Sequence, residues 1–390
     1  MMRKVAVIGV GCIKIGEHWK KSLRDLCFEA FKNALNDAGI ESQMIDGLYI
    51  GNMSSGYYQR QEHLGSLVAD SLGLIGVPAV KIESACSSAG FTFKEAVQAV
   101  ASGMHEIVAA IGVEKMTEVK TPDATSALVM AADHDYEAEF GVTFVGLNAL
   151  IKRRYMHDYN VKDEDIAYFS VHCHKYGANN PHAQYPFPIK LETVMKSPIV
   201  ADPIRLFECA GIGDGAAVAI LCPLEKAREL IDEDRIVEVA GVGAATDTIR
   251  LADHDSLTSF KATILATKRA VSSAKITLKD IDLVEVHDAF SITGIISLED
   301  MGFYKPGQAA KAAVEGELEK DGKLPTNMSG GLKSRGHPVG ATGIYQIIEV
   351  VQQLRGEFGK NQVEDAQIGA AQNIGGVGGS VTVTILRRFR

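Results

Sequence analysis

The chain has 390 residues, of which 46% are hydrophobic and 23% are charged, a composition typical of a globular protein with a large core. Its formal net charge is −9 and it has no long basic run, which argues against nucleic-acid binding as its main task, because phosphate requires a cationic surface. The six cysteines are widely spaced and include no Cys-x-x-Cys, so neither a disulfide framework nor a zinc knuckle is indicated.

The N-terminus leads directly into a short apolar run. This run is too short for a signal peptide, and no later stretch approaches the length of a membrane span. Together with the unpaired pattern of cysteines, this predicts a protein of the reducing cytoplasm.

The apolar run near the N-terminus predicts a strand over residues 4–10 that ends in Gly9-Val-Gly11. This beginning suggests dinucleotide binding, but the next glycine is Gly16 and no helix is expected before a segment at 22–38. The turn-to-helix cradle for a pyrophosphate is therefore missing, which argues against a nicotinamide or flavin cofactor.

The segment Glu83-Ser-Ala-Cys-Ser-Ser-Ala-Gly90 places one cysteine between a predicted strand over residues 77–82 and an amphipathic helix that stops at Gly103. A thiol at a helix N-terminus experiences the positive end of the dipole and free N–H groups, which favour the nucleophilic thiolate. Cys86 is therefore a candidate nucleophile. The alternative is a buried structural cysteine, the usual fate of a free cysteine.

Strand and helix patterns alternate along most of the chain, which predicts a parallel α/β sheet. Strands are expected over residues 46–51, 105–112, 214–221, 236–242 and 281–286, near 368 and over 381–385, with helices over 260–274, from about 292 and over 340–356.

From about residue 116 to 197 the pattern becomes polar and irregular around one or two helices, which suggests a loop region inserted over the sheet. This region holds the basic cluster Lys152, Arg153 and Arg154. The cluster is a candidate for contact with phosphate, and a solvated helix face is the alternative.

Three further motifs place polar residues among small ones. His287 follows an apolar strand in His287-Asp-Ala-Phe, and His337 lies in the glycine-rich turn Gly336-His-Pro-Val-Gly-Ala-Thr-Gly343. The loop Asn373-Ile-Gly-Gly-Val-Gly-Gly379 would leave backbone N–H groups free to face a ligand oxygen. For His287 taken alone, a structural role is an equally good interpretation.

Together the motifs around Cys86, His287 and His337 resemble the thiolase superfamily, closest to its sterol-carrier-protein-type and archaeal branch, whose thiolase partners HMG-CoA synthase. The resemblance runs the length of the chain and includes Ile8-Gly-Val-Gly, Ala201-Asp-Pro-Ile-Arg-Leu206, Gly213-Asp-Gly-Ala-Ala217 and Asn327-Met-Ser-Gly-Gly-Leu-Lys. It implies a duplicated five-stranded, five-layered α/β/α/β/α fold. The N-terminal half would span residues 1–235, with a loop domain inserted at about 117–197, and the C-terminal half would span 236–390.

The resemblance also implies a role for each site residue. Cys86 would carry the acyl group as a thioester, and His337 would deprotonate its thiol and help to polarise the second substrate. His287 stands where simpler thiolases place an Asn that holds a water in an oxyanion hole. Backbone N–H groups of Cys86 and Gly375 would stabilise the oxyanion of the acyl-enzyme. No metal or cofactor is implied beyond the coenzyme A thioester substrate.

One departure from the family pattern concerns proton transfer. Typical thiolases have a second cysteine as acid and base, and the positions where it occurs hold Ala289 and Asn373 here. Either an imidazole takes over this role, or another side chain enters the site, or the protein is a weak or non-thiolytic member. Cys209 is a stand-in only if the fold brings it near, and a small core residue is the alternative.

The predicted function is acetyl-CoA C-acetyltransferase, which condenses two acetyl-CoA to acetoacetyl-CoA. In the branch that the chain resembles, this uphill step feeds HMG-CoA synthase in the mevalonate route to isoprenoids, through a small bridging protein with zinc-ribbon and OB-fold domains. The resemblance further implies at least a dimer. The alternatives are a thiolase-like aldolase or lyase acting on a β-hydroxyacyl-CoA, and a non-catalytic scaffold that binds coenzyme A.

Overall fold

The computed structural model describes residues 2–389, and its centre is a nine-stranded mixed sheet. The strand order is β3-β2-β4-β7-β1-β8-β11-β10-β9. The strands are β1 (Val5–Cys12), β2 (Gly47–Gly51), β3 (Ala79–Ile82), β4 (Val108–Glu114), β7 (Gly215–Pro223), β8 (Val237–Thr246), β9 (Leu283–Glu285), β10 (Ile368–Gly375) and β11 (Ser380–Arg388), while β5 (Ile199–Ala201) and β6 (Ile204–Arg205) pair separately.

Helices cover the sheet and pack between its two groups of strands. They are α1 (Leu23–Ala38), α2 (Ser55–Tyr58), α3 (Leu64–Ser71), α4 (Ser88–Ser102), α5 (Thr121–Val129), α6 (Phe144–Tyr159), α7 (Asp163–Gly177), α8 (Leu191–Lys196), α9 (Leu224–Leu230), α10 (Lys261–Ala274), α11 (Ser291–Asp300), α12 (Ala309–Val314), α13 (Gly331–Ser334) and α14 (Thr342–Arg355). None of the helices in residues 2–389 has the length and apolar character needed to cross a membrane.

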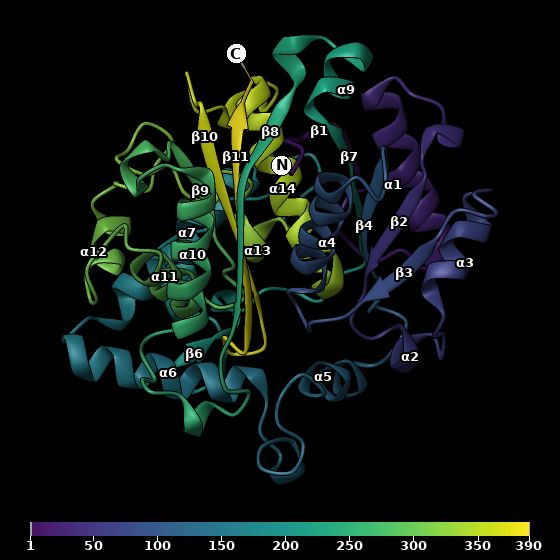
Figure 1. Ribbon diagram of the computed structural model, residues 1–390. Coiled ribbons are helices and arrows are strands. Elements are labelled where there is room, and N and C mark those ends of the chain that lie inside the picture. The colour runs from purple at the N-terminus through teal and green to yellow at the C-terminus, as the bar shows by residue number, and fades with distance from the viewer. Residues whose placement is uncertain (1, 390) are drawn as a thin grey trace.

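The layers follow from three buried clusters. Helices α4 and α14 pack between the two groups of strands, and their apolar residues form one core with both groups (Figure 1). Helices α1 and α3 bury their apolar faces on the outer side of the N-terminal strands, and α10 covers the outer side of the C-terminal strands. This arrangement has the five α/β/α/β/α layers that the resemblance implied.

The sheet differs from the prediction in two respects. It is mixed rather than parallel, because β7 returns antiparallel to β1 and β4, and β10 and β11 form an antiparallel hairpin. The C-terminal half also contributes four strands to it rather than five. Where a fifth would pair with β9, Thr326 makes only an isolated bridge to Val284.

Local sequence signals set the helix ends where they were predicted. Ser22 caps α1 in a reciprocal capping box with Asp25, and Gly39 ends the helix in a left-handed conformation. Gly103 and Gly356 end α4 and α14 in the same way. The two central helices therefore have fixed ends, and their N-termini meet the site described below.

The inserted region is more helical than its polar pattern suggested. Residues 116–197 contain α5, α6, α7 and α8 rather than one or two helices. Ile151, Tyr155, Ile166 and Phe169 bury themselves against the core of the C-terminal half. The pattern was hard to detect because α6 also buries a lysine, so polar residues interrupt its apolar face. The predicted division at residues 235 and 236 falls between α9 and β8 and stays a prediction.

Candidate active site

One pocket brings together the three residues that carry the sequence motifs. Cys86, His287 and His337 all line it, although they come from the start of α4, the segment after β9 and the turn before α14. The rest of the wall is mostly apolar and is formed by Thr125, Leu128, Thr143, Phe144, Val145, Asn148, Cys209, Ala210, Ile212, Ala289, Phe290, Thr293 and Gly376.

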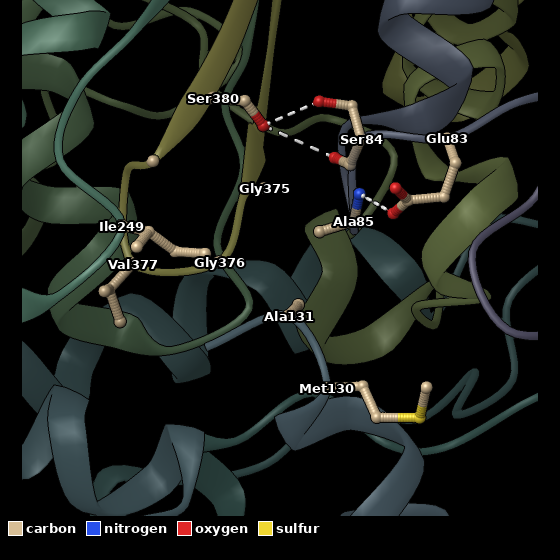
Figure 2. Close-up of a pocket in the computed structure, with 11 residues that line it drawn as sticks. Glu83, Ser84, Ala85, Met130, Ala131, Ile249, Gly375, Gly376, Val377 and Ser380 are labelled. Atoms are coloured by element: carbon tan, nitrogen blue, oxygen red, sulfur yellow. Dashed lines mark hydrogen bonds between the residues drawn. The ribbon is translucent and has the colours of Figure 1, made fainter. Parts of the chain in front are cut away.

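The chain turns sharply between β3 and α4, and Figure 2 shows how this turn is held. Ala85 has a φ of 52°, a left-handed conformation that costs a non-glycine residue about 1–3 kcal/mol. Its N–H donates to Glu83 Oε1 at 2.5 Å, and the Ser84 hydroxyl donates to Ser380 Oγ of β11 at 2.9 Å. A strained turn anchored to the C-terminal half therefore presents Cys86 to the pocket.

The Cys86 thiol is protonated at rest, contrary to the expectation from its helix N-terminus. Burial raises the pKa of Cys86 to about 12. The backbone N–H groups of Gly376 and of Cys86 itself lower this pKa, but burial is the larger effect. Cys86 therefore needs a base to become a nucleophile.

Within the glycine loop, the N–H of Gly376 lies beside the Cys86 sulfur. Gly376 lines the pocket of Cys86, and its N–H faces the sulfur. Gly375 is the last residue of β10, lies opposite Ser380 and lines the neighbouring pocket drawn in Figure 2. Gly375 and Gly376 both line that neighbouring pocket, and the role of the Gly375 N–H as an oxyanion donor stays a prediction.

His337 has its protonation pattern fixed by Thr342, at the start of α14. Thr342 Oγ1 donates to the Pro338 carbonyl at 3.1 Å, so it accepts from His337 Nδ1 at 2.7 Å. Nδ1 therefore carries the proton, and Nε2 is left with a free lone pair. Burial, followed by the charges of Arg335 and Lys333, lowers the pKa of His337 to about 3, so the ring is neutral. The free Nε2 can accept a proton, although the lowered pKa makes this imidazole a weaker base than a histidine in water.

His287 is the opposite tautomer, and its contact with Asn373 fixes that tautomer. The Gly90 N–H donates to Asn373 Oδ1 at 3.2 Å, which leaves the Asn373 Nδ2 group to donate to His287 Nδ1 at 3.1 Å. Nδ1 therefore accepts, and Nε2 carries the proton. Burial and the neighbouring His337, Arg335 and Lys333 lower the pKa of His287 well below its usual range. His287 is thus a neutral hydrogen-bond donor.

The two rings lie together in the pocket. Their centroids are 5.1 Å apart in an edge-to-face arrangement, and both are buried. Because one ring offers a lone pair and the other a proton, the site can accept a proton from a thiol and donate a hydrogen bond to an oxygen.

Sequence reasoning missed several residues that support the site. Nothing in the local pattern indicates the roles of Thr342 and Asn373, which fix the two imidazoles. The same holds for the buried Glu114. Its carboxylate accepts from the N–H groups of Met53 at 2.8 Å and Gly340 at 3.0 Å, which ties the histidine turn to the loop after β2. No spacing in the sequence signals this contact.

The structure contradicts the phosphate-binding prediction for Lys152. Its ammonium is fully buried, lies 2.5 Å from Glu208 Oε1 and 2.5 Å from Asp163 Oδ1, and cannot reach a phosphate. Its partners come from other elements, so the sequence gave no sign of this burial. Arg153 and Arg154 are exposed at the end of α6, where they pair with Asp202 and Asp158 and do not line the pocket.

A thiol at a strained helix entrance, in one pocket with an imidazole lone pair and an imidazole N–H donor, is suited to covalent acyl transfer. Comparison with known proteins gives the same class. The family model for the thiolase N-terminal domain matches residues 5–225, and that for the thiolase C-terminal domain-like region matches residues 243–388. The chain belongs to the thiolase family and is an enzyme of the acyltransferase class.

Curated relatives match over nearly the whole chain. Acetyl-CoA acetyltransferase of Methanothermobacter thermautotrophicus is 50% identical, with 99% of this chain and 100% of the relative covered. The protein of the same name from Methanocaldococcus jannaschii is 43% identical, with 99% of each covered. Human sterol carrier protein 2 is 31% identical, with 99% of this chain and 72% of the relative covered.

Solved structures share the fold over the full chain. The Ltp2-ChsH2(DUF35) aldolase has a TM-score of 0.86 at 25% identity and covers 100% of this chain and 99% of its own. Human mitochondrial 3-ketoacyl-CoA thiolase in complex with CoA has a TM-score of 0.76 at 18% identity, with 100% and 98% covered.

Proposed function

We propose that the protein is an acetyl-CoA C-acetyltransferase that condenses two acetyl-CoA to acetoacetyl-CoA and CoA through an acetyl group on Cys86. The observation that carries this proposal is the single pocket in which the Cys86 thiol meets a basic imidazole and a donor imidazole. The two archaeal relatives named acetyl-CoA acetyltransferase support the choice of acetyl-CoA as the substrate.

In the first half-reaction, Cys86 Sγ attacks the thioester carbonyl carbon while its proton moves to Nε2 of His337. The C–S bond to coenzyme A then breaks, and acetyl-Cys86 remains. The N–H groups of Cys86 and Gly376 stabilise the oxyanion that forms in between. Nε2–H of His287 donates to the thioester oxygen of the second acetyl-CoA as negative charge develops there. The chemistry draws on no metal or cofactor beyond the coenzyme A thioester.

Intact mass after incubation with acetyl-CoA tests this proposal. We expect one acetyl group per chain in the wild type and none in Cys86→Ala, because the sulfur is the acyl carrier. Cys222→Ala is the matched control, since Cys222 lies in β7 and outside the pocket and should leave acetylation unchanged. A wild-type chain that forms no adduct would overturn the proposal.

A second candidate is a thiolase-like aldolase or lyase acting on a β-hydroxyacyl-CoA. The similarity to the Ltp2-ChsH2(DUF35) aldolase favours it, with a TM-score of 0.86. The presence of Cys86 together with both histidines favours acyl transfer instead. Cleavage of a β-hydroxyacyl-CoA by the Cys86→Ala variant at the wild-type rate would support the aldolase. The third alternative, a scaffold that binds coenzyme A, would give neither adduct nor cleavage.

We also propose that the enzyme works in the cytoplasm with HMG-CoA synthase and a small zinc-ribbon and OB-fold bridging protein, in the mevalonate route to isoprenoids. The condensation is uphill, so a partner that consumes acetoacetyl-CoA would draw it forward. The aldolase named as a pair, Ltp2 with ChsH2(DUF35), supports a partner protein. Co-expression of the three chains should give one peak in size-exclusion chromatography. Separate elution would contradict the complex.

A homo-oligomer, a dimer or a tetramer, is proposed as well. Strand β3 is one edge of the sheet, where Val80 within the strand and Ile75 just before it leave 48% and 77% of their surface exposed. An unpaired strand edge with exposed apolar side chains is suited to pairing with a second copy. Light scattering that gives the mass of one chain at micromolar concentration would contradict this.

A further inference from the structure

One proton transfer in the proposed reaction has no residue assigned to it. Condensation requires removal of a proton from the methyl carbon of the second acetyl-CoA, and the two usual positions of a second cysteine hold Ala289 and Asn373. Asn373 is already engaged, because it accepts from the Gly90 N–H and donates to His287. Ala289 lines the pocket but has no group that can titrate.

The lining of the pocket narrows the choice to one side chain. It includes four residues that can carry a transferable proton, namely Cys86, His287, His337 and Cys209. Cys86 is the acyl carrier, and His337 takes the Cys86 proton. His287 keeps its proton on Nε2 and its lone pair on Nδ1 is occupied, so it cannot act as a base. Cys209 is left.

The backbone places Cys209 beside the position of the missing cysteine. Cys209 forms an antiparallel bridge with Phe290, and the Ala210 N–H donates to the Ala289 carbonyl at 2.8 Å. The two short segments thus run side by side along the pocket wall. Cys209 and Ala289 both line the pocket, and the Cys209 thiol donates to the Arg205 carbonyl at 3.6 Å.

A buried cation holds the two segments together. Lys333 Nζ donates to the Glu208 carbonyl at 2.6 Å and to the Asp288 carbonyl at 3.0 Å, so it binds the peptide groups just before Cys209 and Ala289. Burial raises the pKa of Cys209 to about 11, and the positive charge of Lys333 opposes this rise. The cation therefore both positions the thiol and favours its thiolate.

We propose that Cys209 is the second catalytic cysteine, the acid and base that the family pattern places elsewhere. This proposal rests on the function proposed above. As the first C–S bond breaks, the Cys209 thiol gives its proton to the leaving CoA thiolate, while the Cys86 proton stays on His337. The Cys209 thiolate then removes a proton from the methyl carbon of the second acetyl-CoA. The resulting enolate forms a C–C bond to the acetyl carbon of acetyl-Cys86.

The cycle closes without any other reactant. The C–S bond of acetyl-Cys86 breaks, and the Cys86 thiolate recovers its proton from His337. Cys209 again holds one proton, which now comes from the methyl carbon. The net products are acetoacetyl-CoA and CoA, and both cysteines return as thiols.

Cys209→Ser tests the proposal, because the hydroxyl nearly matches the thiol in size but is far less acidic. We expect acetyl-Cys86 still to accumulate to one group per chain, because water can protonate the leaving thiolate. Release of deuterium from trideuteroacetyl-CoA to solvent and formation of acetoacetyl-CoA should both fall by at least about 100-fold. Cys222→Ser, in β7, is the matched control and should change neither rate.

A rescue variant separates a chemical role from a structural one. Ala289→Cys in the Cys209→Ser background returns a thiol to the same part of the pocket, and we expect it to restore at least a tenth of the condensation rate. Condensation by Cys209→Ser within threefold of the wild type would overturn the proposal, as would loss of the acetyl adduct in that variant. Absence of the adduct in the wild type would instead remove the proposed function, and this inference with it.

Discussion

The two central helices begin in different ways, and the difference explains the division of labour in the site. The turn before α4 carries Cys86, and the turn before α14 carries His337. The first turn is strained at Ala85 and surrounds its thiol with backbone N–H groups. The second uses Gly336, at a φ of 114°, and holds its imidazole through the side chain of Thr342.

Two similar positions thus acquire complementary chemistry. Backbone donors next to a sulfur stabilise negative charge wherever it forms, so the first turn suits an acyl carrier and its oxyanion. A side-chain acceptor next to an imidazole selects one tautomer, so the second turn suits a base. In both cases burial keeps the resting group neutral: it raises the pKa of Cys86 to about 12 and lowers that of His337 to about 3.

Of all the changes to these two turns, removal of the imidazole of His337 should slow acetylation of Cys86 most. In His337→Ala the rate constant for acetylation of Cys86 should fall by about 10²–10⁴-fold, because no group then accepts the thiol proton. Quenched-flow samples analysed by intact mass give this rate. His157→Ala, at an exposed site on α6, is the control. A reduction of less than tenfold would mean that Cys86 is activated from the first turn alone.

The first turn can be examined alone through alkylation by iodoacetamide. Because the pKa of Cys86 is raised to about 12, its thiolate fraction is small at pH 7 and grows as the pH rises. The alkylation rate at Cys86, followed by peptide mass spectrometry, should therefore increase about tenfold per pH unit from pH 7 to 10. A plateau between pH 6 and 8 would instead reveal a resting thiolate paired with a charged His337.

Thr342→Val leaves the imidazole in place but removes its acceptor. The His337 Nδ1–H is then buried without a partner, which costs about 1–3 kcal/mol and removes the preference for one tautomer. We expect acetylation of Cys86 to slow by about tenfold, measured by the same quenched-flow method. Thr342→Ser keeps the hydroxyl and should retain most of the rate. Equal rates for the valine and serine variants would show that the Thr342 hydroxyl does not support the proton transfer to His337.

The smallest expected effect is a change in stability that comes from the strained turn at Ala85. Ala85→Gly relieves a left-handed conformation, so the free energy of unfolding should rise by about 0.5–1 kcal/mol, as measured by urea denaturation. Ala89→Gly, inside α4, should lower it by a similar amount or more, because that residue is helical and buried. If both variants lose stability, the turn at Ala85 is not strained.

The sequence predicts the parts of the site that depend on local pattern. The motifs around Cys86, His287 and His337 come from three distant segments, and their resemblance to one family was enough to anticipate the thiolase fold. Helix ends at Gly39 and Gly103 were also predictable, because a glycine at a helix C-terminus acts through its own backbone.

The sequence does not predict what tertiary contacts decide. The pKa of Cys86 depends on burial by residues far along the chain, which outweighs the helix N-terminus that the sequence showed. Lys152 looked like a surface cation because its partners Glu208 and Asp163 lie in other elements. Asn373 looked like a missing cysteine, and its contact with His287 appears only once β10 packs beside α4.

Two neutral imidazoles of opposite tautomer divide the chemistry of the site between a proton acceptor and a hydrogen-bond donor. Long-range ¹⁵N–¹H NMR correlation of the histidine-labelled protein tests it most directly, with His287→Asn and His337→Asn variants for assignment. We expect a proton on Nδ1 of His337 and on Nε2 of His287, with no charged form of either between pH 6 and 8. The same tautomer on both rings, or an imidazolium on either, would contradict it.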